Sequence, residues 1–380
     1  MNLMNVMLDG PKKSCIQSES KASLKTFCAD PVKTICTNGL QKKYEGRIET
    51  YKNNCLQKVL SDLPKKPLSP NASDAEKTEW ITNFLNYLIS AEEKLPDYKS
   101  QTYSAFNKIK EGQKNLVYAS RLPKDEKYRL VYDIDPVDLR TNSGYILNEN
   151  ASLEIHALPA EQRLAKINDI VKKSPNMYLS LVNTYTLRCG SDGLIPNAYA
   201  AAQMYQTGSN KSEIVICLGL IVQGAKNPNL CEKSTFDPDD TQGTLAHEIG
   251  HASSVNNEHV SANSTFKKCM TTNYPTLNPT ELYAEELKAD YWTSLVLENR
   301  MNEMKARYGE NREALYHDVQ DVFQSYCDTY QSNGTDTHAP GMYRIEYMLS
   351  NPNIRKAIGC ETAAPQPFCS LLPKKTNLDP

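Results

Sequence analysis

The chain has 380 residues and a formal net charge of −2, so it is long enough for a well-buried core and for two or three domains. A nearly neutral chain has no global field that attracts nucleic acid or a membrane surface, so we expect no nucleic-acid partner. The best apolar run, EIVICLGLIV at 213–222, is far shorter than a bilayer requires. The sequence therefore predicts no integral membrane segment.

The cysteines bear on the cellular compartment. All eleven are dispersed and none lies in a C-x-x-C pair, which argues against a zinc ribbon and a thioredoxin-type motif. Cysteines in this number fit disulfides formed in an oxidising space, and the alternative is a reduced cytosolic protein with buried thiols. The start, MNLMNVMLDG, is too short for a signal peptide and has no basic region. We expect an exported protein, periplasmic or secreted, whose leader is absent from this sequence.

The N-terminal third is predicted to be helical, with no visible chemistry. A helical stretch is expected from about 41 to 60, and the proline-rich linker PKKPLSPN follows at 64–71. Ser73 and Glu76 have the spacing of a capping box at the start of an amphipathic helix. A second, polar helix is expected from about 98 to 119.

Extended and helical patterns then alternate. Residues 130–155 have an extended pattern, after which Pro159 opens an amphipathic helix. The stretch NAYAAAQMY at 197–205 and the apolar run at 213–222 are both predicted to be strands. The acidic loop DPDDTQ at 237–242 introduces a further helix.

The C-terminal part is predicted to be helical again. Asn278 is a good cap for a helix that continues past Leu297, and apolar residues from 315 to 326 predict one more. This uneven mixture indicates an α+β fold. We expect three parts: a Lys- and Cys-containing helical segment 1–63, a helical module 64–130, and a chemistry-bearing domain 131–380.

The stretch LAHEIGHA at 245–252 carries the first candidate site. On a helix, His247 and His251 lie one turn apart on the same face. Two imidazoles at this spacing can reach one ion at about 2.1 Å. Glu248, beside the first histidine, can take a proton from a water on that ion. The alternative is a solvated helix with incidental histidines.

A catalytic zinc has three protein ligands and an open position, so a third ligand is required. His259 does not have the spacing of the metzincin motif. The stretch ELYAEELKADYW at 281–292 offers Glu286 as the ligand, and Asp290, one turn later, can accept the second N–H of a ligand histidine. The small Ala289 lets two helices approach closely. For E-x-x-A-D in isolation, a solvated acidic helix is the simpler interpretation.

HEIGH together with EELKAD resembles the gluzincin peptidases, which are zinc enzymes with two histidine ligands and one glutamate ligand. Within them it is most similar to the HtpX-like and CAAX-prenyl-protease group. IPNAYA at 195–200 is similar to the Asn-Ala-Phe-Ala segment of that group, and EIVICLGLI to the edge strand that follows it. THAPGMYRIEYML at 337–349 is similar to the His-Pro-x-x-x-x-Arg-Ile segment, with His338 and Arg344 at the same separation.

The resemblance extends from about Ile195 to Leu349 and implies that 131–380 is a zincin-like metallopeptidase domain with a small mixed sheet and an active-site helix. It implies a zinc-dependent endopeptidase that cleaves extended segments of a protein or peptide substrate. In this resemblance one Zn²⁺ is held by His247, His251 and Glu286, and Glu248 activates water. Asp290 orients a ligand histidine, and His338 and Arg344 support the oxyanion. The substrate pairs along an edge strand that contains Asn197, Ala198, Tyr199 and Ala200.

The chain also departs from that group. His338 is followed by Ala339 and Pro340, where the group has proline directly, and the membrane helices of the group are missing. Cys189, in LRCGSDG, is expected to form a disulfide and not a cysteine switch. The alternatives are a non-catalytic, zinc-stabilised binding or chaperone-like protein and a disulfide-stapled structural protein. The N-terminal module is a pro-segment, a gate or a recruitment element.

Overall fold

The computed structural model of the chain combines many helices with one small sheet, so the α+β expectation is confirmed. The structure describes residues 21–36, 41–66, 68–95, 99–202, 212–225, 227, 229–231, 242–254, 261–274, 281–309, 323, 341–360, 364 and 366–372.

The sheet has three strands in the order β1-β3-β2. They are β1 (Asp138–Arg140), β2 (Ala198–Ala202) and β3 (Ser212–Ile216). β1 runs parallel to β3, and β2 pairs with β3 in the antiparallel sense, with Ala200 opposite Ile214. Among the described strands, β2 therefore stands at an edge of the sheet.

The prediction that EIVICLGLI is an edge strand is wrong. Its first half is β3, the central strand, and its second half is the short helix α12 (Leu218–Gln223). A continuous apolar run fits a buried helix as well as a buried strand, because it has no period that separates the two. Every residue of α12 is buried, and Gly219 packs so tightly that an added Cβ would lie 2.1 Å from the carbonyl oxygen of Leu194.

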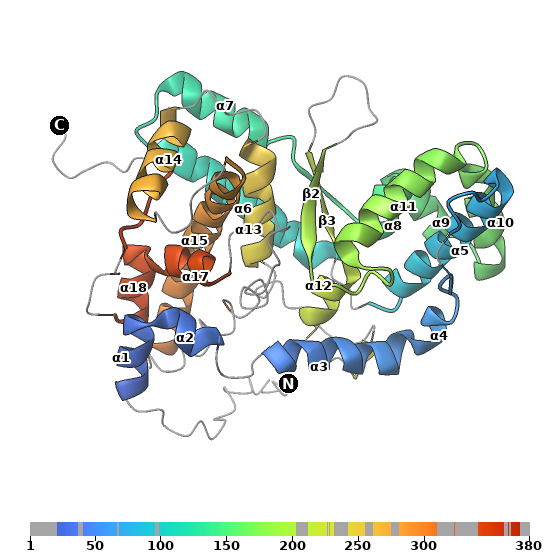
Figure 1. Ribbon diagram of the computed structural model, residues 1–380, viewed down its shortest axis with the longest axis horizontal. Helices are drawn as coiled ribbons and strands as arrows, with labels where there is room; N and C mark the ends of the chain where they lie inside the picture. Colours follow the sequence, from blue (N-terminus) through green and yellow to red (C-terminus); the bar gives the residue numbers. More distant parts are fainter. Residues whose placement is uncertain are drawn as a thin grey trace, which may run out of the picture.

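Helices cover both sides of the sheet (Figure 1). One side holds α5 (Asp74–Glu92), α8 (Asn142–Leu147), α9 (Glu149–His156), α10 (Ala160–Val171) and α11 (Pro175–Cys189). The other side holds α6 (Lys99–Ala119), α7 (Lys124–Ile134), α13 (Gln242–Ser254), α14 (Ser261–Asn273), α15 (Glu281–Tyr308), α17 (Gly341–Leu349) and α18 (Pro352–Ile358). α13 lies directly beside β2 and β3.

The N-terminal helices lie along the lower side of the molecule in Figure 1. They are α1 (Lys21–Ala29), α2 (Pro31–Cys36), α3 (Gln41–Tyr51), the π-helix η1 (Lys52–Leu56) and α4 (Gln57–Leu60). The last three confirm the helical stretch predicted from 41 to 60. The capping box of Ser73 and Glu76 is also formed: Ser73 Oγ accepts from the Glu76 N–H, and Glu76 Oε2 accepts from the Ser73 N–H at 2.7 Å.

Other predictions for the helices are confirmed or corrected. The helix after Pro159 and the helix past Leu297 are both present, whereas Asn278 and all of 315–326 except Phe323 lie outside the described residues. The extended pattern predicted for 130–155 is wrong, because α7, α8 and α9 occupy most of it and β1 has only three residues. In α7 the buried Leu130, Val131 and Ile134 follow the helical period.

α13 and α15 are packed unusually closely. A Cβ added at Gly250 of α13 would lie 2.9 Å from the Cα of Ala289 and 2.8 Å from Cδ1 of Trp292, both on α15. One end of the same interface is held by Thr293 Oγ1, which donates to the carbonyl of Gly243 at 3.1 Å. These two contacts fix α13 and α15 as antiparallel neighbours, and they confirm that the small Ala289 permits a close approach.

Four disulfides connect distant parts of the chain: Cys28–Cys360, Cys55–Cys231, Cys189–Cys217 and Cys269–Cys369. The expected disulfides, including one at Cys189, are thus confirmed. They are compatible with export to an oxidising compartment. Among the described helices, none combines the length and the apolar character needed to cross a bilayer. The predicted domain boundaries at 63/64 and 130/131 stay a prediction.

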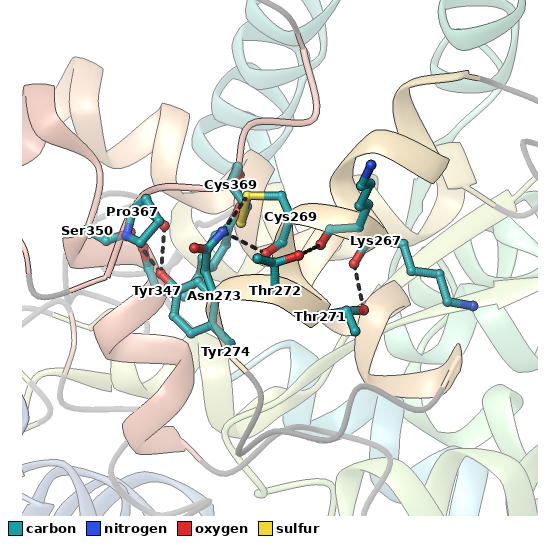
Figure 2. The surroundings of a disulfide bond; sticks show 11 residues. Lys267, Cys269, Thr271, Thr272, Asn273, Tyr274, Tyr347, Ser350, Pro367 and Cys369 are labelled. Carbon is teal, nitrogen blue, oxygen red and sulfur yellow. Dashed lines mark hydrogen bonds between the residues drawn. A yellow bond between two sulfur atoms is a disulfide. The ribbon is translucent and has the colours of Figure 1, made fainter.

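The Cys269–Cys369 disulfide anchors the C-terminal segment beside α17 (Figure 2). Tyr347 of α17 donates its hydroxyl proton to the carbonyl of Cys369 at 2.7 Å, and Tyr274 donates to the carbonyl of Pro367 at 3.1 Å. Tyr347 is completely buried. Because α17 also carries Arg344, this disulfide supports one wall of the candidate site described below.

We expect Gly250→Ala to lower the free energy of unfolding by about 1–3 kcal/mol, because the new methyl group overpacks the α13–α15 interface. Gly46→Ala is the matched control: it lies in α3, where an added Cβ meets nothing within 4 Å, and should be neutral or stabilising by roughly 0.5–1 kcal/mol. Chemical denaturation of both variants measures the difference. Equal effects would contradict the close packing.

We expect the double variant Cys269→Ser, Cys369→Ser to be less stable than the parent chain by about 2–5 kcal/mol, because this disulfide closes a long loop in the unfolded chain. Its sequence separation is 100 residues. Thermal unfolding of the double variant and of the parent, both under non-reducing conditions, tests the prediction. Identical midpoints would show that the disulfide does not hold α17 in place.

Candidate metal centre

The close packing of α13 and α15 brings three potential ligands together. His247 and His251 lie one turn apart on α13, and Glu286 faces them from α15. His251 Nε2 lies 3.0 Å from His247 Nε2, and Glu286 Oε2 lies 3.2 Å from each of these nitrogens. Tetrahedral ligation at about 2.0–2.1 Å separates neighbouring ligand atoms by about 3.3 Å. The three atoms therefore have nearly the spacing that one small metal ion requires.

Asp290 fixes the tautomer of His247. Asp290 Oδ1 lies 2.9 Å from His247 Nδ1, and the carboxylate of Asp290 is fully buried. The pKa of Asp290 is raised by burial, but the charge and hydrogen bonds of Arg344 and the hydrogen bond of His247 outweigh burial and hold the pKa well below its usual range. An ionised carboxylate only accepts hydrogen bonds, so His247 Nδ1 carries the proton. The lone pair of Nε2 on a neutral His247 then points toward His251 and Glu286.

The centre of the site favours positive charge. Burial and the Arg344 charge lower the pKa of His247, but the hydrogen bonds of Asp290 and Glu286 and the Asp290 charge raise it overall, to about 9. Burial raises the pKa of Glu286, but hydrogen bonds from His247 and His251 outweigh it and hold the pKa well below its usual range. Three acceptor atoms in mutual contact repel one another unless a cation or a proton lies between them.

The buried charges around the candidate ligands leave an excess of negative charge that a divalent cation could neutralise. Arg344 donates to both carboxylate oxygens of Asp290, each at 2.8 Å, so these two buried groups neutralise one another. Glu286 and Glu248 are also buried, each with 7% of its surface exposed. Burial of two further carboxylates is costly without compensating charge. One divalent cation would supply that charge, so the residues present fit a metal ion.

Glu248 connects the metal site to the edge strand. Its Oε2 accepts a hydrogen bond from the backbone N–H of Ala200 at 2.8 Å. Ala200 belongs to β2, and this N–H points away from β3, toward α13. The predicted substrate strand and the predicted base are thus in direct contact, which orients the Glu248 carboxylate. His251 keeps 21% of its side chain exposed, so the site is open to solvent on that side.

The predicted edge-strand residues lie as follows. Ala198, Tyr199 and Ala200 belong to β2, with Ala198 and Tyr199 buried. Asn197 precedes the strand: its carbonyl accepts from the Cys217 N–H at 2.9 Å and its side chain donates to the carbonyl of Arg188 at 3.2 Å. The strand β2 is therefore Ala198–Ala202, and the two hydrogen bonds of Asn197 fix the backbone directly before the strand.

Six predicted site residues lie together: His247, Glu248, His251, Glu286, Asp290 and Arg344. The contacts of Arg344 differ from the predicted ones. Arg344 was expected to face the reacting oxyanion, whereas its Nε and one terminal nitrogen bind Asp290. One terminal nitrogen of Arg344 also lies 3.2 Å from His247 Nδ1, so Arg344 contacts His247 both directly and through that carboxylate. Its role toward the oxyanion stays a prediction. His338 and His259 lie outside the described residues. The contact of Glu248 with Ala200 was missed, because no sequence pattern relates a helix residue to one strand N–H.

Comparisons with protein-family models, with curated proteins and with solved structures return no match for this chain. Among the described residues, His247, His251 and Glu286 form the group of side chains able to hold a metal ion, with ligand atoms all within 4.8 Å of one another.

We expect Asp290→Asn to weaken metal binding by about 10- to 100-fold, because the amide no longer fixes the His247 tautomer as an anionic acceptor. Glu286→Gln should weaken it further, since it removes a charged ligand. Asp169→Asn, an exposed position on α10, is the matched control. Competition of each variant with a chromogenic chelator for Zn²⁺ gives the affinities, and circular dichroism verifies the fold. Unchanged affinity in both site variants would contradict the assignment.

Proposed function

We propose that the protein is a zinc-dependent endopeptidase of the gluzincin type, similar to soluble members of the HtpX-like and CAAX-prenyl-protease group. One observation supports this most strongly: two histidines and a glutamate converge within 3.0–3.2 Å, next to a glutamate that contacts an edge strand. Two histidines, one glutamate and an open position form a known type of catalytic zinc site.

Each side chain has a defined part in this proposal. His247, His251 and Glu286 would hold Zn²⁺, which when bound supplies a Lewis acid that lowers the pKa of a coordinated water. Glu248 is the general base that accepts the proton of the attacking water, and the Ala200 N–H holds its carboxylate in place. Asp290, itself held by Arg344, keeps His247 in the tautomer that presents Nε2.

The substrate in this proposal is an extended segment of a protein. β2 stands at the edge of the sheet beside α13, so a substrate backbone can pair with its outward-facing main-chain groups other than the Ala200 N–H, which Glu248 engages. Such pairing reads the backbone more than the side chains and favours endopeptidase activity on unfolded or flexible segments. Support of the oxyanion by His338 and Arg344 remains part of the proposal.

A second candidate function uses the same scaffold without hydrolysis, as a zinc-stabilised binding or chaperone-like protein. The Glu248–Ala200 hydrogen bond is the observation that favours this candidate, because it gives Glu248 a structural contact that needs no catalysis. A binding protein has no need for an ionisable side chain at that position, since an amide could accept the same hydrogen bond. The presence of a carboxylate therefore favours the peptidase.

We expect Glu248→Gln to keep the fold and the zinc but to lose cleavage by at least 100-fold, because the amide still accepts from Ala200 and cannot accept a proton. Glu161→Gln, an exposed position on α10, is the matched control and should cut like the parent chain. Mass spectrometry of reduced casein after incubation with each protein measures cleavage and gives the cut sites.

Two results would contradict the proposal in different ways. Equal cleavage by Glu248→Gln and the parent would show that the active site is elsewhere. An absence of cleavage by a parent chain that holds one zinc would support the binding protein instead.

A further inference from the structure

A pocket of about 540 Å³, lined by none of the three candidate metal ligands, lies between α6 and α15 and next to the first residue of α13. Ile109 and Leu116 of α6 and Leu295 and Val296 of α15 give it aliphatic walls. Its volume is in the range of ordinary ligand sites. Val296 is ten residues after Glu286 on one continuous helix, which corresponds to about 15 Å.

One buried polar group of this pocket has an unused acceptor. Gln113 lines the pocket with 2% of its surface exposed. Its amide nitrogen donates to the carbonyl of Ala246 at 3.4 Å, but its Oε1 has no hydrogen-bond partner among the described residues. An unsatisfied buried acceptor costs roughly 1–3 kcal/mol, so a ligand that donates a hydrogen bond there would gain by doing so.

The charges in the pocket are balanced. Its four charged side chains are Lys108, Arg300, Glu111 and Glu303, two of each sign. Lys108 pairs with Glu303 at 3.5 Å, from α6 to α15, and Glu111 pairs with Lys114 at 2.5 Å. The formal charges of these four lining side chains sum to zero, so the pocket does not favour a strongly charged ligand of either sign.

The uncharged polar residues of the pocket are all amides: Gln113, Asn115, Gln242, Asn299 and Asn302. Each offers both donors and an acceptor, which matches the alternating N–H and C=O groups of a peptide backbone. No aromatic ring is among its lining residues, so it offers no stacking platform for a nucleobase or a sugar ring. Aliphatic walls suit small apolar side chains such as valine and alanine.

We propose that this pocket is a second polypeptide-binding site, which holds a neutral extended segment through its backbone, with Gln113 Oε1 accepting a backbone N–H. The inference goes beyond the proposed peptidase activity and does not depend on it. Gln113 also contacts Ala246, the residue directly before His247, so the bound segment would adjoin the helix that carries the metal ligands.

The test uses the full chain with Glu248→Gln, so that the probe stays uncut. The probe is an acetylated and amidated hexapeptide of serine, valine and alanine that carries one photo-leucine and a fluorescent label. Fluorescence anisotropy gives its affinity, and mass spectrometry after irradiation gives the crosslinked residues. We expect crosslinks on α6 and α15, and at least fivefold weaker binding for Asn299→Trp, which fills the pocket from an exposed position.

Two further variants make the result decisive. Gln113→Leu should also weaken binding, and Asn168→Trp, an exposed asparagine on α10, should not. If Gln113→Leu fails to fold, Asn299→Trp decides alone. Crosslinks confined to β2 and α13, unchanged affinity in Asn299→Trp, or no binding at all would overturn the proposal. None of these outcomes bears on casein cleavage, so the two proposals fail separately.

Discussion

The candidate site depends on the direct contact between α13 and α15. Gly250 and Ala289 remove the side chains that would hold the two helices apart, so Glu286 of one helix reaches the two histidines of the other. A single methyl group at position 250 would have to displace either the α15 backbone or Trp292. The packing of the two helices and the geometry of the candidate ligands are therefore set by one steric constraint, and the candidate metal site is inseparable from the core.

Electrostatics adds a second layer to that packing. Asp290 and Arg344 form a buried pair in which both oxygens of the carboxylate are engaged, and the same carboxylate holds His247. Because the pair is neutral, it orients the histidine without contributing net charge to the ligand set. The negative charge of Glu286 and Glu248 is then left for a cation to balance. Arg344 is delivered by α17, which the buried Tyr347 and the Cys269–Cys369 disulfide support.

The disulfides narrow the possible roles of the N-terminal region. Cys28 is joined to Cys360 and Cys55 to Cys231, and Arg47 and Asn54 also bind Gln223 and Asn229. A pro-segment that leaves after one backbone cleavage is incompatible with two covalent ties to the C-terminal half. A gate or a recruitment element is compatible with them. The pocket proposed as a second polypeptide-binding site is built partly from α6, so that proposal would place a recruitment function on residues of the N-terminal half.

The amino-acid sequence by itself predicted the candidate ligands. Helical periodicity is local, so residues four apart share a face, and this alone paired His247 with His251 and Glu286 with Asp290. Joining the two pairs into one candidate site rested on the resemblance to the gluzincin peptidases. The capping box of Ser73 and Glu76 followed from local spacing, and a disulfide at Cys189 was expected from the number and dispersion of the cysteines. Only the tertiary structure decided that β3 is central and β2 lies at the edge, that Arg344 binds Asp290, and that Glu248 accepts from Ala200. These depend on which segments meet across long stretches of chain, where a short apolar run or a lone arginine has no period to reveal its partner.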